Sequence, residues 1–479
     1  MFENRNNVVN GGGRGNLATM PLRPRHYWIV GVASLGQLIG TVVATIAGII
    51  IPMLNIVLHP ELSSFMQGVI GAVDLIGICI GSVIFGRLSD RYGYLFFFRF
   101  CPALIFVAST AAIFIGDVTW LTICLFIVGL GIGGEYSLDS DYVSELMPDR
   151  YKSLMVGVAK TASALGNIIA AAIGFGLLMF WRAADMWPRL LWIISLTAAL
   201  MFVLRIWFYQ SPGWLLSKGR TAEAEAAVKK FLGNDVVIDI PETASNSSTP
   251  TGTAKGATKS TSNTSGTKTG LLSFTAKNWK KVVLSGIPWA CEGLGVYGIG
   301  VFLPILVMAL GLEHFVPGEA KILHVADSVK ITLYISCIML PGFIAGLVLI
   351  HQGRRITAIQ TWGFIMCAVA LGVLMPAYEY HWNKWIAIGA FMAFEFFLNM
   401  GPHLITYVLP PKVYPVAERG LGVGIAAAIG KIGAVLGVFL IPVLLEAGGA
   451  MLVLGVSAGV MALGAAVTYL FRHTVPSNT

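Results

Sequence analysis

The sequence predicts an all-α membrane protein with 12 transmembrane helices in two six-helix halves. Its 479 residues are 56% hydrophobic and only 12% charged, against about 25% charged in soluble domains. Apolar runs recur along the chain at lengths near the roughly 20 residues that a helix needs to cross a bilayer. Six such runs precede a long polar interruption and six follow it. This pattern excludes a soluble enzyme, a disordered chain and a secreted disulfide scaffold.

The predicted spans divide the chain into five regions. These are a cytoplasmic N-terminal tail at 1–26, a first half at 27–210, a central loop at 211–281, a second half at 282–471 and a C-terminal tail at 472–479. The spans of the first half are expected near 27–57, 64–86, 94–115, 118–146, 151–181 and 188–210. Those of the second half are expected near 282–311, 328–350, 356–377, 384–410, 420–446 and 449–471. The 55 glycines fit helices that approach closely through small-residue faces.

The central loop contains two different kinds of segment. Thr221 to Leu232 is rich in alanine and carries its charges in an amphipathic pattern, which predicts a helix. Residues 243–270 are almost entirely Ser, Thr, Gly, Asn, Ala and Lys, a composition that cannot bury a core. We therefore expect a flexible tether there.

The positions of Lys and Arg predict the orientation. The N-terminal tail and the turns after the second and fourth spans are basic, whereas the turns after the first and third spans have no Lys or Arg. Short cytoplasmic loops carry such an excess, so both termini and the central loop are expected in the cytoplasm, and the protein in the plasma (inner) membrane. Because topology accounts for the net charge of +8, no nucleic acid partner is expected.

The turn between the second and third spans carries a charged motif, Gly86-Arg-Leu-Ser-Asp90-Arg91-Tyr-Gly93. A carboxylate and a guanidinium at a helix end can bond a neighbouring helix terminus and favour one conformation. A solubilising turn is the alternative. The motif resembles the G-x-L-a-D-R-x-G signature of the major facilitator superfamily, whose fold is two six-helix halves around a central cavity. The matching turn of the second half keeps Gly353-Arg354-Arg355 but has Ile350 and His351 in place of the usual Asp and Arg.

Residues near the ends of helices 4 and 6 resemble the sugar porters. Ser211-Pro-Gly-Trp214-Leu is similar to their P-E-S-P-R-W-L segment, with Gln210 for Glu and Gly213 for Arg, and Glu145 and Arg150 match their charged exit from helix 4. Together with the turn motif, this resemblance implies a set of gating residues. They are Gly86, Asp90, Arg91, Gly93, Glu145, Arg150, Arg354 and Arg355.

Four further segments resemble the proton-coupled phosphate symporters. They are Gly131-Ile-Gly-Gly-Glu135-Tyr136, Trp289 with Tyr297, Phe396-Phe-Leu-Asn399-Met-Gly401-Pro402-His403, and Gly430-Lys431-Ile-Gly433. The chain departs from that pattern where Gly293 replaces an Asp, with Glu292 one position earlier, and where Ser163 replaces a Gln. Half of the implied phosphate shell is altered, so the resemblance indicates kinship without fixing the substrate.

Ionisable residues inside apolar spans are costly, so they mark ion and substrate paths. Glu135, in a glycine-rich part of helix 4, is the first candidate for proton coupling, with a structural ion pair as the alternative. Asp139 follows one turn later on the same face and could instead be a hydrated gate residue. Asp74 and Glu292 complete the proton-coupling candidates, and Glu395 is a further intramembrane acid.

Lys431 in helix 11 is the best candidate for holding a substrate anion, or for pairing with Glu135 when the site is empty. Its alternative is a lysine that extends to the cytoplasmic surface. Lys160 in helix 5 is the second cation. The predicted substrate-binding residues are Tyr136, Lys160, Trp289, Tyr297, Asn399, His403 and Lys431.

The resulting hypothesis is a proton-coupled symporter that takes up a small anionic solute, such as phosphate, an organic acid or a sugar acid, by alternating access. Its expected partners are the solute, protons and the lipid bilayer, it is expected to be a monomer, and it needs no cofactor or metal because the proton gradient supplies the energy. Protonation of Glu135 would release Lys431 to meet the anion. An antiporter that exports a metabolite or drug, a neutral sugar:proton symporter and a membrane receptor remain alternatives. No catalytic motif indicates an enzyme.

Overall fold

The computed structural model describes residues 15–17, 19–233, 236–237, 271–314, 320–414 and 419–475. The tether expected at 243–270 lies outside these residues, and so does the side chain of Asp90. Within the described residues, eleven helical stretches are long and apolar enough to cross a membrane. The last of them has non-helical backbone at Gly448 and Gly449, which divides it into two crossings. The predicted twelve transmembrane helices are therefore confirmed.

The first bundle contains six crossings. They are formed by α1 (Pro24–Ala33) with α2 (Leu35–Val57), α3 (Ser64–Tyr92), α4 (Tyr94–Ile115), α5 (Val118–Leu146), α6 (Lys152–Trp181), and the 3-10 helix η2 (Ala184–Leu190) with α7 (Leu191–Arg205). Side chains cap two of these helices where they begin. Asp117 accepts hydrogen bonds from Thr119 N and Trp120 N at the start of α5, and Ser63 accepts one from Met66 N at the start of α3.

The second bundle also has six crossings, several of them interrupted. They are formed by α12 (Trp279–Gly293), the π-helical turn η3 (Leu294–Ile299) and α13 (Leu303–Ala309), by α14 (Lys321–Cys337) with α15 (Met339–His351), by α16 (Ile356–Glu379), by α17 (Lys384–Met400) with α18 (Pro402–Val408), and by the two parts of α20 (Arg419–Phe471). Pro402 stands at the break between α17 and α18, because proline cannot donate the hydrogen bond that would continue the helix.

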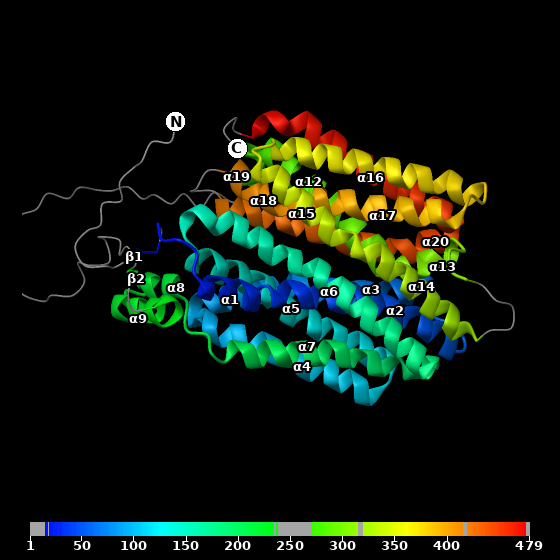
Figure 1. Ribbon diagram of the computed structural model, residues 1–479, viewed down its shortest axis with the longest axis horizontal. Coiled ribbons are helices and arrows are strands. Elements are labelled where there is room, and N and C mark those ends of the chain that lie inside the picture. The colour runs from blue at the N-terminus through cyan, green and yellow to red at the C-terminus, as the bar shows by residue number, and fades with distance from the viewer. Residues whose placement is uncertain are drawn as a thin grey trace, which may run out of the picture.

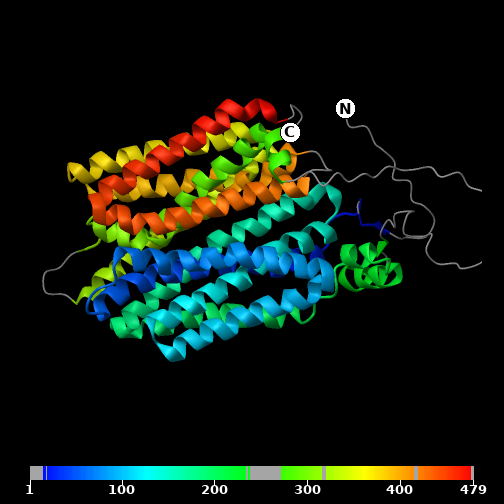
Figure 2. The same ribbon diagram turned by 180° about the vertical axis from the view of Figure 1, so that it is seen from behind.

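The two bundles lie side by side with their long axes parallel (Figures 1 and 2). The first bundle is drawn in blue to green and the second in green to red. Helices α2, α3 and α6 of the first bundle contact α14 and α20 of the second. Any side chain that points out of these helices toward the other bundle is placed at the interface between them.

Short elements gather at one end of the molecule, which we call the α9 end (Figure 1). There α8 (Pro212–Ser217) and α9 (Thr221–Leu232) pack against each other, and the two-residue strand β1 (Gly15–Asn16) pairs in parallel with β2 (Val236–Val237). The helix predicted at Thr221 to Leu232 is thus confirmed. The remaining short elements are η1 (Asp149–Tyr151), α11 (Leu271–Lys277), α19 (Pro410–Val413) and η5 (Arg472–Thr474).

Candidate functional site

Two lysines from different bundles meet at the interface. Lys160 on α6 is 5% exposed, and Lys431 on α20 is partly buried. Their ammonium groups lie 5.9 Å and 5.0 Å from the centroid of one ring, that of Tyr136 on α5. In the part of the chain that the structure describes, neither ammonium group has a carboxylate within 4.0 Å. Among the described residues, the two cations therefore share one interface without a carboxylate in direct contact, and Glu292 is an acid that interacts with both from a longer distance.

Each lysine is held by neutral groups instead. Lys160 Nζ donates to Gln37 Oε1 at 3.1 Å and lies 4.2 Å from the centroid of the Tyr407 ring. Lys431 Nζ donates to the Tyr297 hydroxyl at 3.5 Å and lies 4.9 Å from the centroid of that ring. Aromatic faces attract cations, but an ammonium group has three donors. Both lysines thus keep hydrogen-bonding capacity for a further acceptor.

Trp289 and His403 of the second bundle lie near this pair of lysines. The Trp289 ring centroid is 5.1 Å from that of Tyr407. His403 follows the break at Pro402, and its Nδ1 lies 3.8 Å from Glu292 Oε1. That distance is too long for a hydrogen bond, and Nδ1 is buried without a partner. The imidazole is therefore a second group with unused hydrogen-bonding capacity.

The glycine before Lys431 is required by the close approach of Trp289. A Cβ at Gly430 would lie 2.6 Å from the Trp289 ring, which is shorter than a van der Waals contact. The Gly-Lys sequence thus allows the tryptophan to pack flat against α20 immediately beside the lysine. The motif that carried the family resemblance is explained by this packing.

Asn399, Glu395 and Asp74 form their direct hydrogen bonds with residues other than the two lysines. Asn399 donates to the Glu395 carbonyl at 2.7 Å and to Glu395 Oε2 at 3.1 Å, on its own helix. Asp74 on α3 is buried and accepts from Leu75 N at 2.7 Å. Within the described ranges neither residue forms a hydrogen bond or an ion pair with the lysines, and Asp74 interacts with Lys431 only from a longer distance.

A second charged cluster lies inside the first bundle. Arg205, the last residue of α7, is fully buried and forms ion pairs with two carboxylates of α5, those of Glu135 and Asp139. The Asp139 contact is 3.0 Å. Arg205 also donates to the Phe98 carbonyl at 3.1 Å, and its guanidinium carbon lies 3.7 Å from the centroid of the Phe98 ring. One arginine thus joins α4, α5 and α7.

This cluster corrects the expected pairing of Glu135 with Lys431. Glu135 points into the first bundle and pairs with Arg205, whereas the next residue, Tyr136, faces Lys431. Successive residues on a helix point about 100° apart. One turn of α5 therefore contributes Glu135 to the Arg205 cluster and Tyr136 to the lysine cluster. Asp139 is 2% exposed, so it is not a hydrated surface residue.

Helix α2 covers both clusters through two glycines one turn apart. A Cβ at Gly36 would lie 2.8 Å from Asp139 Cγ, and a Cβ at Gly40 would collide with the Tyr136 hydroxyl group. Only the absence of side chains at these positions lets α2 pack against Asp139 and Tyr136. The same helix, α2, therefore covers one side of both clusters.

Glu145 has the clearest contacts among the predicted gating residues. Its carboxylate accepts hydrogen bonds from the Ser211 hydroxyl and, at 3.0 Å, from Gly213 N. A Cβ at Gly213 would lie 2.7 Å from the Glu145 carboxyl carbon. Gln210 accepts from Leu95 N at 2.9 Å and from Ser211 N at 3.2 Å. At the two positions where the resemblance implies Glu and Arg, Gln210 and Gly213 thus take part in hydrogen bonds with backbone N–H donors.

The other gating residues make fewer contacts. Gly93 ends α3 with φ of +103°, a conformation that favours glycine, and Gly86 packs near Ser137. The Arg91 and Arg150 guanidinium groups lie over the rings of the adjacent Tyr92 and Tyr151. Arg354 and Arg355 are exposed. None of these four arginines forms an ion pair with a residue that the structure describes.

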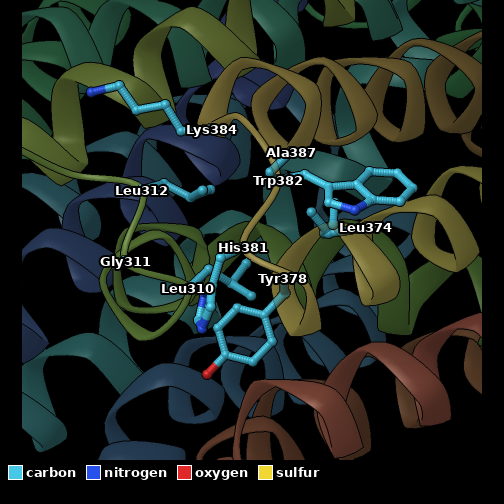
Figure 3. Close-up of a pocket in the computed structure, with 10 residues that line it drawn as sticks. Leu310, Gly311, Leu312, Leu374, Tyr378, His381, Trp382, Lys384 and Ala387 are labelled. Carbon is cyan, nitrogen blue, oxygen red and sulfur yellow. The ribbon is translucent and has the colours of Figure 1, made fainter.

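A separate pocket, whose lining side chains are drawn in Figure 3, lies next to the end of α13, which Figure 1 shows opposite the α9 end. Its volume is about 180 Å³, and its lining includes Gly311, Tyr378, His381, Trp382 and Lys384. None of the predicted site residues lines it. We therefore place the candidate site at the interface lysines and not in this pocket.

Comparison with known proteins places the chain in a family. Residues 16–475 match the family model described as "Sugar (and other) transporter". The chain belongs to this family. It is 26% identical over 414 residues to the inner membrane metabolite transport protein YgcS of Escherichia coli, covering 86% of this chain and 83% of the relative. It is 24% identical to the niacin transporter NiaP of Acinetobacter baylyi, covering 88% and 87%.

Solved structures give the same fold. The partially occluded inward-open xylose transporter XylE from E. coli superposes with a TM-score of 0.73 at 17% identity, covering 94% of this chain and 98% of that chain. XylE is described as a proton:xylose symporter of the major facilitator superfamily. The fold that the sequence resemblance implied is confirmed. The chain is a multi-pass membrane transporter and not an enzyme.

Sequence reasoning missed Arg205, Tyr407 and Gln37. Arg205 lies within the predicted span 188–210 and could have been found by the rule that picked out the intramembrane acids. Tyr407 and Gln37 gave no comparable signal, because uncharged polar residues are common in transmembrane helices. Only the packing of α6 against α2 identifies Gln37 as a neighbour of Lys160, and only its packing against the second bundle identifies Tyr407.

Proposed function

We propose that this transporter is a proton-coupled symporter that takes up a small anionic solute by alternating access of its two bundles. The observation that carries this proposal is the pair of interface lysines without carboxylate partners. A charged side chain at membrane depth is costly unless it is compensated. The direct contacts of Lys160 and Lys431 are aromatic rings, a hydroxyl and an amide, and the buried Glu292 interacts with both lysines only from beyond 4.0 Å. An anion between the lysines would complete their direct coordination.

The position of the two lysines supports binding between the bundles. Each bundle contributes one ammonium group, and Tyr136 lies within 6 Å of both, at 5.9 Å and 5.0 Å from its ring centroid. Transporters of this class bind substrate near the bilayer midplane at the interface of their repeats. An anion that contacts both lysines would draw the bundles together around it.

The aromatic residues define the remaining walls of the site. Tyr136, Trp289, Tyr297 and Tyr407 offer ring faces and hydroxyl donors of the kind that small-molecule sites use to orient a ligand. An organic carboxylate fits this combination of cations and rings, and the relative NiaP is named for niacin. We therefore include niacin with inorganic phosphate among the solutes to test.

Transport by purified protein in proteoliposomes tests the proposal. Uptake of radiolabelled niacin, inorganic phosphate and, as a neutral comparison, xylose is measured with and without an inward proton gradient. We expect an anion to accumulate when the gradient is present and to do so less when a protonophore dissipates it. Accumulation of xylose with no uptake of either anion would reject anion transport and favour the neutral sugar:proton symporter.

The direction of coupling needs its own measurement. In vesicles of known orientation, a symporter accumulates solute when the solute and proton gradients point the same way, and an antiporter when they oppose each other. The segment 166–174 of α6 lacks the Gly-Pro pair typical of antiporters, which favours symport. Accumulation driven by an outward proton gradient would instead identify an exporter.

The orientation proposed from the basic loops places the α9 end in the cytoplasm, with both termini on that side of a plasma (inner) membrane. We propose that the transporter works as a monomer, with the proton gradient as its energy source and no cofactor. Protease accessibility of the central loop in right-side-out and inside-out vesicles tests the orientation. Cleavage from the outer face would reverse it.

A further inference from the structure

We propose that Glu135 and Asp139 hold a single proton between them across Arg205, and that this pair is the proton-binding site of the symporter. The inference deepens the proposed function and rests on its proton coupling. In place of a single proton-carrying residue, it assigns a site of two carboxylates. The single arginine between them determines that this site binds one proton. Nothing at the lysine cluster is needed for it.

The first argument is a count of charges in a closed space. Glu135, Asp139 and Arg205 are 0%, 2% and 0% exposed. Two ionised carboxylates against one guanidinium leave one negative charge without compensation, and an uncompensated charge inside a membrane bundle is costly. One proton on the pair removes that charge. Carboxylates that share a site behave in this way, because the second cannot ionise beside the first.

The second argument is the hydrogen bonding of the two carboxyl groups. Each gives one oxygen to Arg205. The other oxygen of each, Glu135 Oε1 and Asp139 Oδ2, is buried and has no hydrogen-bond partner. Buried polar atoms without a partner are uncommon, and a proton on one of these oxygens turns an unmet acceptor into a donor. The geometry thus offers a position for the proton on either residue.

The surrounding helices offer no second cation to the pair. On α4 the Cys101 thiol interacts with all three groups, and on α5 the Tyr142 hydroxyl interacts with Arg205, but neither is a cation. Arg99 on α4 donates to the carbonyls of Ile206 and Phe208 at 2.8 Å and 3.0 Å, which occupies its guanidinium at the end of α7. Helix α2 faces the pair with Gly36, which has no side chain. Within the described residues, Arg205 is therefore the pair's only ion-pair partner.

The location of the pair also gives a route for coupling. Tyr136 follows Glu135 in the chain and contacts Lys431, and α2 covers both clusters through Gly36 and Gly40. A movement of α2 that admits a solute to the lysines would also uncover Asp139 to water. The proton would then pass from a carboxyl oxygen to that water and leave the carboxylate bound to Arg205.

Infrared difference spectroscopy tests the inference without any solute. The C=O stretch of a protonated carboxylic acid is recorded for purified protein in nanodiscs at neutral pH, and the spectrum of each variant is subtracted from that of the wild type. We expect Glu135→Gln and Asp139→Asn each to remove the same one protonated group. In either variant the remaining carboxylate balances Arg205 alone and needs no proton.

Two further variants sharpen this result. Arg205→Gln should raise the signal from one protonated group to two, because both carboxyls then lack a cation. Asp74→Asn serves as the matched control, since Asp74 is a buried acid that does not contact Arg205, and it should leave the signal of the pair unchanged. If Arg205→Gln does not fold, the two near-isosteric carboxyl variants still decide the question.

Two outcomes would overturn the inference. Loss of the signal in only one carboxyl variant would assign the proton to one residue, and no loss in either would show that both are ionised. Because the measurement needs no transported solute, it is independent of the anion. A protein that accumulates xylose and takes up neither niacin nor phosphate would refute anion transport and leave the shared proton unaffected.

Discussion

Lys160 of the first bundle lies with its ammonium group 4.2 Å from the centroid of the Tyr407 ring of the second bundle. The cation and the ring that holds it therefore belong to parts of the protein that move relative to each other in alternating access. When the bundles separate, this contact is lost and the ammonium group must find water or another partner. The contact is thus present only while the two bundles are packed together at this point of the interface.

Replacing Lys431 by Ala should weaken substrate binding more than it lowers expression. Loss of a hydrogen bond to a charged group costs about 1.5–3 kcal/mol, which corresponds to roughly 10- to 150-fold in apparent affinity. The affinity is measured from the concentration dependence of solute exchange in proteoliposomes. An unchanged value would mean that Lys431 does not bind the solute.

Replacing Tyr407 by Leu should remove the contact between the Lys160 ammonium group and an aromatic ring, whereas Tyr407→Phe should preserve it. A desolvated cation over an aromatic ring is worth up to about 2 kcal/mol, and phenylalanine keeps the ring while leucine removes it. Because Lys160 is then less well positioned to bind the solute, we expect the apparent affinity for the solute to fall by roughly 10- to 30-fold in the leucine variant. Equal loss in both variants would point to the hydroxyl group and not to the ring.

Glu135→Gln should abolish accumulation driven by a proton gradient while solute exchange continues. The variant leaves Asp139 to balance Arg205, so the alternating movement keeps a neutral pair in the first bundle but no longer carries a proton. Uptake and exchange are measured on the same vesicles, with Glu395→Gln as a control at a buried acid outside both clusters. Normal proton dependence in Glu135→Gln would show that the coupled proton binds elsewhere.

Gly213→Ala should destabilise the protein by disturbing the contact between α8 and the end of α5. A Cβ there would lie 2.7 Å from the carboxyl carbon of Glu145, so either Glu145 or the backbone donor must move. We expect a loss of about 1–3 kcal/mol, measured as a lower unfolding temperature in detergent. Gly389→Ala is the control, because a Cβ at Gly389 meets nothing within 4 Å. If both variants unfold at the wild-type temperature, the Glu145 contact does not contribute to stability.

Much of the fold could be predicted because its main signal is local. Twenty apolar residues in a row have few structures open to them in a bilayer, so the spans and α9 followed from composition and periodicity. The break at Gly448 and Gly449 also matched the predicted gap between the last two spans, at 446 to 449. These features depend on neighbours in the sequence and not on distant partners.

The pairing of charges could not be predicted in the same way. Glu135 and Arg205 are 70 positions apart, and nothing in the sequence says which intramembrane cation a given acid will meet. The expectation that Glu135 would pair with Lys431 was wrong. A difference of one position along α5 determines whether a side chain points toward Arg205, as Glu135 does, or toward Lys431, as Tyr136 does. The lysines themselves were identified correctly as intramembrane cations, because the cost of burying a charge does not depend on the partner.

The arrangement around Arg205 also limits how this chain can change by mutation. Loss of the arginine alone leaves two acids without a cation, and loss of both acids leaves an unpaired guanidinium in the bundle. The least harmful path removes one acid first, then the arginine together with the second acid. Lineages descended from this protein should therefore gain or lose these three residues as a group, and an isolated change at Arg205 should persist only where a second substitution restores neutrality.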